Sequence, residues 1–234
     1  KNIPDAEAWM NVTETALKQT DQIFTNIKEN LTTGASDDNT ANDRQKILER
    51  LKGLRAELYS SGNADYAERT VFTGYRTGES LTFLSTDTDL NSKYMIHETF
   101  DAKALETFNY ITSDDNDETN VTQNDVSRIR LSYDNVNDVE TPAQITLADG
   151  TSITVTKKSI AGLSQSDIDD IYTKVPDDKA YLIPETGELI LGEDAAANYA
   201  NAAASGEATF EYTKNQWNSG DLRPEHYFAC TQTT

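Results

Sequence analysis

The pattern closest to a known binding site is a run of oxygen-bearing side chains between positions 87 and 98. Positions 1, 3, 5 and 12 of the calcium-binding EF-hand loop are matched by Asp87, Asp89, Asn91 and Glu98. The sharp turn at position 6 of that loop requires glycine, and this chain has Ser92 there. Clear helical patterns on either side are also lacking. Chance matches are expected in so acidic a chain, so we predict no metal site here.

Catalytic chemistry has few candidate residues. Histidine, the usual base of a hydrolase triad, occurs only at His97 and His226, and neither lies in a Gly-x-Ser-x-Gly or His-Glu-x-x-His motif. The single cysteine, Cys230, excludes an internal disulfide and a multi-cysteine zinc site. A carboxylate pair that hydrolyses glycosides remains an alternative, because acidic residues are abundant. We predict a protein without catalytic residues, cofactor or metal.

Charge and composition narrow the class of partner. The 234 residues suffice for one large or two ordinary domains, and 40 acidic against 20 basic residues give a net charge of −20. Such a charge repels phosphate, so neither nucleic acid nor an anionic membrane surface is an expected partner. Only 36% of the residues are hydrophobic, which is common in extracellular proteins. No apolar run approaches the roughly 20 residues that span a bilayer.

Two amphipathic segments near the N-terminus predict a helical hairpin. In residues 6–31 large apolar side chains recur every seven positions, and in residues 43–58 they recur at spacings of four, three and four. Turn and capping residues separate the two segments, and Thr40 or Asn42 is expected to cap the second helix. We expect both apolar rows to pack with each other and with a returning helix that this chain does not include. The predicted stem-core residues are Met10, Leu17, Phe24, Leu31, Ile47, Leu51, Leu54 and Leu58.

After residue 63 the pattern changes from helix to strand. Alternating runs around turn residues predict three hairpins, with turns at Thr77-Gly78, at Asp149-Gly150 and at residues 185–187. Two short helices are expected from a cap at Ser164 and from an alanine-rich run, and the acidic run 114–118 is expected in a loop. The predicted hairpins span residues 70–84, 145–155 and 181–191, the helices end near 175 and 204, and a last strand covers 208–212.

These elements predict an α+β fold in three parts. Residues 1–83 form a helical-hairpin stem with a β-hairpin, and residues 84–220 form a β-rich outer domain with short helices. Residues 221–234 are expected to return toward the stem.

Several residue groups in the first 83 positions, with one near the end, carry a family resemblance. An Asp-Ala-x-x-Trp motif opens the first helix, and an aromatic segment with a Phe-x-Gly core follows the hairpin. The arrangement resembles the flagellin superfamily, and within it the hook-associated protein 3 family of hook–filament junction proteins. One departure is Ala67-Glu68, where many relatives carry glycines. The matching residues are Asp5, Ala6 and Trp9; Thr15, Ala16 and Leu17; Asp43, Arg44, Gln45 and Ile47; Phe72, Gly74, Tyr75, Arg76 and Thr77; and 223–228.

The resemblance implies a non-enzymatic, extracellular component of the bacterial flagellum, exported by the flagellar type III apparatus and needed for motility. Its implied partners are hook-associated protein 1, flagellin, an export chaperone before secretion, and other copies of itself in a ring. The family's terminal helices are not matched, so we expect a core fragment that stays monomeric. Exposed Lys28, Arg50 and Arg55 are the expected contacts to neighbouring subunits. A flagellin filament subunit, or a carbohydrate-binding or adhesive surface protein, remains an alternative.

Overall fold

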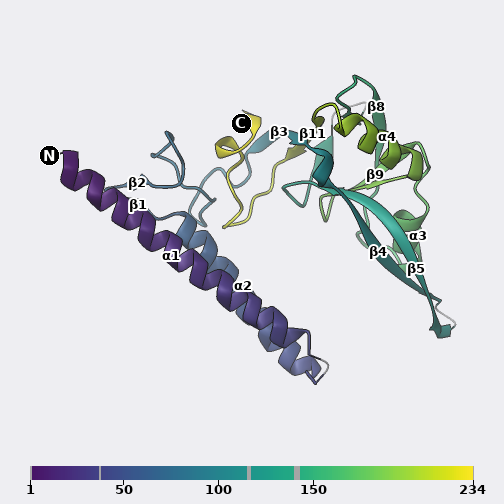
Figure 1. Ribbon diagram of the computed structural model, residues 1–234, viewed down its shortest axis with the longest axis horizontal. Helices are drawn as coiled ribbons and strands as arrows, with labels where there is room; N and C mark the ends of the chain where they lie inside the picture. Colours follow the sequence, from purple (N-terminus) through teal and green to yellow (C-terminus); the bar gives the residue numbers. More distant parts are fainter. Residues whose placement is uncertain (1, 37, 115–116, 140–142, 234) are drawn as a thin grey trace. The chain divides into compact units, whose positions relative to one another are not determined.

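The computed structural model describes residues 2–36, 38–114, 117–139 and 143–233 of an α+β chain. The chain divides into two compact units, which we call the stem unit (residues 1–90 and 217–227) and the sheet unit (residues 91–216 and 228–234). The chain therefore passes between units after residues 90, 216 and 227, whereas the sequence patterns place boundaries at 83 and 220 (Figure 1).

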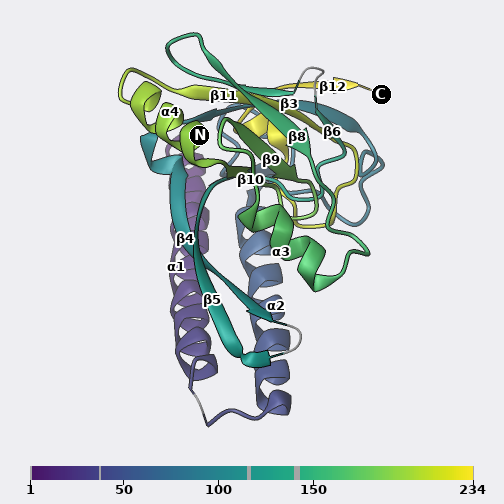
Figure 2. The ribbon, with the colours of Figure 1, turned by 90° about the vertical axis from the view of Figure 1, so that its right-hand side faces the viewer.

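The stem unit begins with the predicted helical hairpin. Helices α1 (Asn2–Gly34) and α2 (Ala41–Gly62) lie side by side (Figures 1 and 2). Thr40 caps α2, as predicted, in a reciprocal arrangement: its hydroxyl accepts from the Asp43 amide at 3.2 Å, and its own amide donates to the Asp43 carboxylate at 3.3 Å. Hydrogen bonds from the Thr40 side chain and backbone lower the pKa of Asp43. Both bonds satisfy amides that the first helical turn leaves without partners.

A two-stranded hairpin follows α2, but not where the sequence pattern places it. Strands β1 (Asp65–Tyr66) and β2 (Arg69–Thr70) meet at a turn in which Ala67 and Glu68 have φ of 50° and 63°. The predicted hairpin over residues 70–84 is wrong, because residues 70–77 form a closed loop instead of a strand. Threonine hydroxyls in this loop bond to nearby carbonyls and so compete with an extended ladder.

The C-terminal part of the stem unit packs on the residues that precede the sheet. The Trp217 ring stacks on Phe83, with 4.8 Å between the ring centroids. The Arg223 guanidinium also lies over the Phe83 ring, 4.6 Å from its centroid. Arg223 is buried and pairs with Asp89 at 2.6 Å. A short helix, η2 (Pro224–His226), ends this segment. Aromatic packing and the ion pair therefore attach residues 217–227 to the rest of the stem unit.

The sheet unit is built on a ten-stranded mixed sheet. Its main path runs β12-β3-β11-β7-β8-β9-β10-β5-β4, and β6 pairs with β11. Among the described residues, β8 and β9 pair in parallel and the remaining named pairs are antiparallel. The strands are β3 (Lys93–Phe100), β4 (Leu105–Asp114), β5 (Asp117–Arg130), β6 (Asp138–Val139), β7 (Gln144–Thr146), β8 (Ser152–Lys157), β9 (Lys179–Ile183), β10 (Glu188–Leu191), β11 (Ala208–Lys214) and β12 (Ala229–Thr233).

Two predicted hairpins of the sheet unit are confirmed. Strands β7 and β8 join through a turn with Gly150 at φ of 85°, and β9 and β10 join through Gly187 at φ of 68°. A Cβ at Gly187 would lie 2.2 Å from the Tyr133 carbonyl oxygen, so glycine is required there for space as well as for conformation. Of the acidic run 114–118, predicted as a loop, Asp114 ends β4 and Asp117 and Glu118 begin β5, while residues 115 and 116 lie outside the described residues.

Short helices pack on the sheet as the sequence predicts. Ser164 caps α3 (Gln165–Thr173), and α4 (Glu193–Ala203) buries Ala195, Ala196 and Ala202 together with Tyr199. A 3₁₀ turn, η1 (Ala102–Ala104), joins β3 to β4. Because β10 pairs with β5 only over residues 127–130, the rest of β4 and β5 forms a two-stranded ribbon, which is prominent in Figure 2.

Candidate assembly surface

Helix α1 carries a row of exposed large apolar side chains. Ile3 is 74% exposed, Met10 is 69% exposed, and Leu17, Phe24 and Leu31 are each 55% exposed. Their seven-residue spacing places all five on one face of the helix. We call these five residues the α1 row.

The prediction that Met10, Leu17, Phe24 and Leu31 are buried in the stem core is therefore wrong for this chain. A second row with the same spacing, shifted by one position, packs against α2 instead, and it includes Ala16 and Ile23. The reason is close approach between small residues. The Ser61 hydroxyl of α2 donates to the Ala16 carbonyl at 3.1 Å and lies 3.1 Å from the Thr20 hydroxyl. A bulkier side chain at position 16 would not fit at this contact, so the row that contains Ala16 faces α2 and the neighbouring row that contains Leu17 does not.

The predicted face of α2 does pack toward α1. Leu54 is buried, and Ile47, Leu51 and Leu58 are half-buried. In both helices of the hairpin, the buried side chains thus recur with the helical spacing seen in the sequence. On α1, however, two neighbouring rows share this period, and periodicity alone does not identify the buried one.

The three predicted interface cations are all exposed. Lys28 lies on α1, and Arg50 and Arg55 lie on α2. Within the part of the chain that the structure describes, none of the three forms an ion pair or side-chain hydrogen bond. Lys28 follows Phe24 by four positions and precedes Leu31 by three, so it borders the α1 row. Its charge is therefore available to a molecule that covers this row.

A cavity beside the N-terminal half of α1 was not predicted from the sequence. It encloses about 520 Å³ between α1 and the β1–β2 hairpin, with Asp5 and Gly74 among its lining residues. Trp9 and Tyr66 form an edge-to-face pair, with centroids 6.4 Å apart and planes at 82°. The Arg69 guanidinium lies 5.4 Å from the Trp9 centroid. The cavity thus combines aromatic walls with a cation, a combination used in binding sites.

The loop of residues 70–77 borders this cavity and is held by internal hydrogen bonds. The Thr70 amide donates to the Thr77 carbonyl at 2.9 Å, and the Thr73 hydroxyl donates to the Arg76 carbonyl at 3.0 Å. Thr70 and Thr73 are buried, whereas Tyr75, which follows the cavity-lining Gly74, is 92% exposed. The motif carried by residues 72–77 in the sequence therefore displays an aromatic side chain on a fixed backbone.

The residues of the calcium-loop template have separate roles. The Asp87 carboxylate accepts from the Leu84 amide at 2.7 Å, and Asp89 pairs with Arg223. Glu98 is buried in the sheet unit, where it accepts from the Tyr212 hydroxyl at 2.7 Å. Burial, together with the Glu98 charge, raises the pKa of Tyr212. Among the described residues, no group of three or more acidic, histidine or cysteine side chains is arranged to hold a metal ion.

Both histidines make local contacts. The His97 Nδ1 atom lies 2.8 Å from the Glu211 carboxylate on the neighbouring strand, and the His226 Nε2 atom lies 2.8 Å from the Ser80 carbonyl oxygen. Since a carbonyl only accepts, Nε2 of His226 carries the proton. The two histidines belong to different units, and each is explained by its structural contact.

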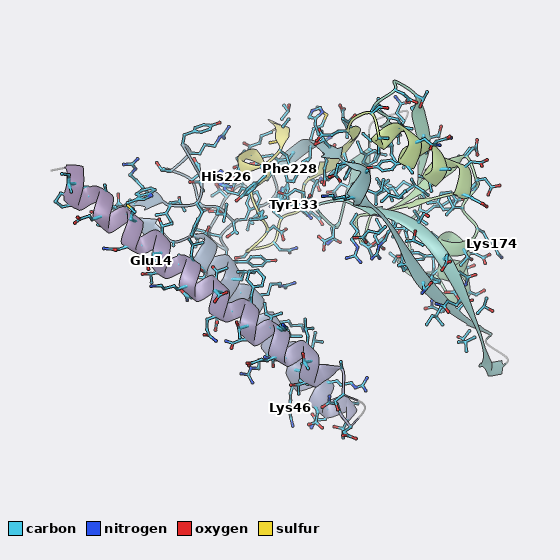
Figure 3. The ribbon with its side chains drawn as sticks, in the orientation of Figure 1. Glu14, Lys46, Tyr133, Lys174, His226 and Phe228 are labelled. Atoms are coloured by element: carbon cyan, nitrogen blue, oxygen red, sulfur yellow. The ribbon has the colours of Figure 1, made fainter. Side chains whose placement is uncertain are left out.

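The matched segment 223–228 is divided between the units. Its first residue, Arg223, lies in the stem unit, whereas Phe228 lies in the sheet unit and packs edge-to-face on Tyr133, with centroids 5.7 Å apart (Figure 3). Both ends of the segment are thus fixed by an aromatic contact, Arg223 on Phe83 and Phe228 on Tyr133.

In the sheet unit, a polar and aromatic cluster attaches α3 to the β4–β5 ribbon. The rings of Tyr110 and Tyr172 stack at 4.6 Å, and their hydroxyls donate to Asp169 at 2.7 Å and to Glu188 at 2.8 Å. Burial, aided by the bond to Asp169, raises the pKa of Tyr110 to about 12. This cluster packs a helix on a ribbon, and both carboxylates accept hydrogen bonds from tyrosine hydroxyls.

Comparison with protein-family models, curated proteins and solved structures finds no match to this chain. None of the described helices combines the length and the apolar character needed to cross a membrane. The fold is α+β, and the candidate site comprises the α1 row, the three exposed cations of α1 and α2, and the Trp9 cavity.

Proposed function

We propose that this protein is a structural adapter of the bacterial flagellum, located at the hook–filament junction. In this role it connects hook-associated protein 1 to flagellin outside the cell, after export by the flagellar type III apparatus with the help of a chaperone. It performs no catalysis. The observation that carries the proposal is the α1 row, five large apolar side chains that face solvent along one helix.

A row of this kind is one side of a helix–helix seam. From Ile3 to Leu31 it extends about 42 Å, at 1.5 Å per residue. Large apolar side chains that stay exposed at a regular seven-residue spacing suit packing against another helix. The α1 row therefore supports a role in an assembly of helices. The sequence resemblance to hook–filament junction proteins supports the flagellar setting.

The three exposed cations fit the same role. In a chain with twice as many acidic as basic residues, copies in a ring repel one another unless cations meet carboxylates across the contact. Lys28, Arg50 and Arg55 have no partners among the described residues and so remain available for such contacts. Charge reversal at these positions is expected to weaken ring assembly, and unchanged assembly would remove them from the interface.

Deletion of the gene tests the function directly. Loss of a junction protein is expected to leave hooks without filaments and to release flagellin into the medium. Complementation with Phe24→Glu is expected to fail, because a charge interrupts the apolar seam. Gln22→Glu adds a charge to an exposed position outside the α1 row and is expected to restore filaments.

Other outcomes would identify the alternatives. Lost filaments without flagellin in the medium would indicate a filament subunit. Intact motility after deletion would contradict the proposal and favour an adhesive surface protein. The readouts are electron microscopy of hooks and immunoblotting of the medium for flagellin. Both are made on cells and culture medium, so they do not require the purified chain.

A further inference from the structure

The cavity beside Trp9 and the loop that borders it together have the residue composition of a binding hot spot. Its main residues are Trp9, Tyr66 and Arg69 at the cavity and Tyr75 and Arg76 on the loop, and we call these five residues the Trp9 surface. Tryptophan, tyrosine and arginine are the residue types that contribute most often to protein–protein hot spots. Here all three types occur together, outside the residues that the sequence resemblance implies as an interface.

The two arginines of this surface retain unused hydrogen-bonding capacity. Arg69 donates from Nε to the Thr77 hydroxyl at 3.4 Å, and no described residue bonds to its terminal nitrogens. Arg76 is exposed, and its guanidinium has neither an ion pair nor a hydrogen bond to any described residue. A guanidinium binds a carboxylate through two parallel hydrogen bonds. The chemistry that completes the surface is therefore a carboxylate beside an apolar group.

The backbone beneath the Trp9 surface is held in place before any partner arrives. The internal bonds of residues 70–77 fix the loop that carries Tyr75, so little conformational entropy is lost on binding. The adjoining turn keeps Ala67 and Glu68 in the left-handed region, which strains residues other than glycine. Such strain is typical of functional sites, because the surrounding structure must enforce it.

We propose that the Trp9 surface binds a second copy of this chain through acidic side chains of that copy. Charge identifies the occupant: the chain carries 40 acidic against 20 basic residues, so a neighbouring copy presents mainly carboxylates to the two arginines. The exposed Tyr75 then packs against the apolar stems of the same partner segment. This proposal rests on the proposed function, since an assembling subunit meets other copies of itself.

Photo-crosslinking between isotopically distinct copies tests this contact. Benzoylphenylalanine replaces Tyr75 in the full chain, and equal amounts of unlabelled and ¹⁵N-labelled protein are irradiated at about 0.1 M salt, where repulsion between the net charges is screened within about 10 Å. Mass spectrometry is expected to find crosslinks that join a labelled to an unlabelled copy. The matched control places the same probe at Tyr227, which is 57% exposed in the same unit. We expect about tenfold fewer crosslinks there, the ratio that corresponds to one strong charged contact.

Charge reversal supplies a second arm. Arg69→Glu is expected to lower the crosslink yield at position 75 about tenfold. Lys103→Glu makes the same charge change at an exposed position of the sheet unit and is expected to leave the yield unchanged. Equal yields at positions 75 and 227, an absence of mixed crosslinks, or equal effects of the two reversals would each overturn the proposal.

The two proposals fail separately. If gene deletion leaves motility intact while the crosslinks form as expected, the junction function fails and the self-contact stands. If deletion yields hooks without filaments while position 75 gives no mixed crosslinks, the function stands and the Trp9 surface does not contact another copy.

Discussion

At the scale of single residues, two neighbours on α1 have opposite environments. Ile23 is 2% exposed against α2, whereas Phe24 belongs to the α1 row. Replacing Ile23 with alanine is expected to lower the free energy of unfolding by about 2–5 kcal/mol, because it leaves a cavity. Phe24→Ala is expected to change it by less than about 0.5 kcal/mol. Urea unfolding of both variants measures this, and equal losses would show that the α1 row is buried in solution.

The strained turn between β1 and β2 gives a prediction of opposite sign. Glu68 has φ of 63°, where glycine is free of steric strain. Glu68→Gly is therefore expected to raise the free energy of unfolding by about 1 kcal/mol. The matched control, Glu57→Gly, lies inside α2 and is expected to lower it by about 1 kcal/mol. Thermal unfolding monitored by circular dichroism separates the two, and a destabilising Glu68→Gly would contradict the strain argument.

At the scale of elements, the start of α2 depends on its capping box. Thr40→Ala is expected to lower the free energy of unfolding by about 1 kcal/mol, whereas Thr40→Ser keeps a hydroxyl and is expected to cost only a few tenths. Hydrogen exchange of the first α2 amides is the local readout. Unchanged protection in the alanine variant would contradict the role of the cap.

The attachment of α3 to the ribbon has an alkaline limit. The pKa of Tyr110 is raised from 10.0 to about 12, so the folded state favours the protonated phenol. Its contribution to stability is complete below pH 10 and is lost as the pH rises through about 12. Spectrophotometric titration at the absorbance of tyrosinate is expected to show several late-titrating tyrosines, among them Tyr199 and Tyr212, and Tyr110→Phe is expected to remove one of them. A normal titration of all tyrosines would contradict the contact with Asp169.

Sequence patterns predict the elements of this chain better than their environments. Periodicity and capping residues identify the helices at 2–34 and 41–62, and turn residues identify the hairpins at Gly150 and Gly187. The failure at residues 70–84 arises because hydrogen bonds of threonine side chains close a loop that β propensity favours as a strand. These hydrogen bonds form only once the loop is folded, so the sequence pattern does not reveal them.

The candidate site is predictable only in part, for a related reason. The exposure of Lys28 follows from its charge, whereas the exposure of Met10 depends on which of two adjacent rows fits against α2. The Trp9 cavity joins α1 to a hairpin more than fifty residues later in the chain, and no local pattern connects them. Arg69 lies sixty positions from Trp9 in the sequence, so the sequence does not suggest that the two form a site.

At the scale of the whole molecule, charge governs how copies approach one another. A net charge of −20 repels at long range, and the repulsion is screened within about 10 Å at 0.1 M salt. Self-association of the isolated chain is therefore expected to strengthen as salt rises to moderate levels and as carboxylates become protonated below pH 5. Light scattering measures this, and association that is independent of salt and pH would contradict control by net charge.

The α1 row also contains a chemical reporter. Met10 is one of two methionines in the chain, and peroxide converts an exposed methionine to the polar sulfoxide. Met95, half-buried on β3, provides an internal reference. In the free chain Met10 is expected to be oxidised before Met95. A helix packed over the α1 row would shield the Met10 sulfur, and the polar sulfoxide would weaken that packing. Oxidative stress before assembly would thus disable a subunit whose fold remains intact.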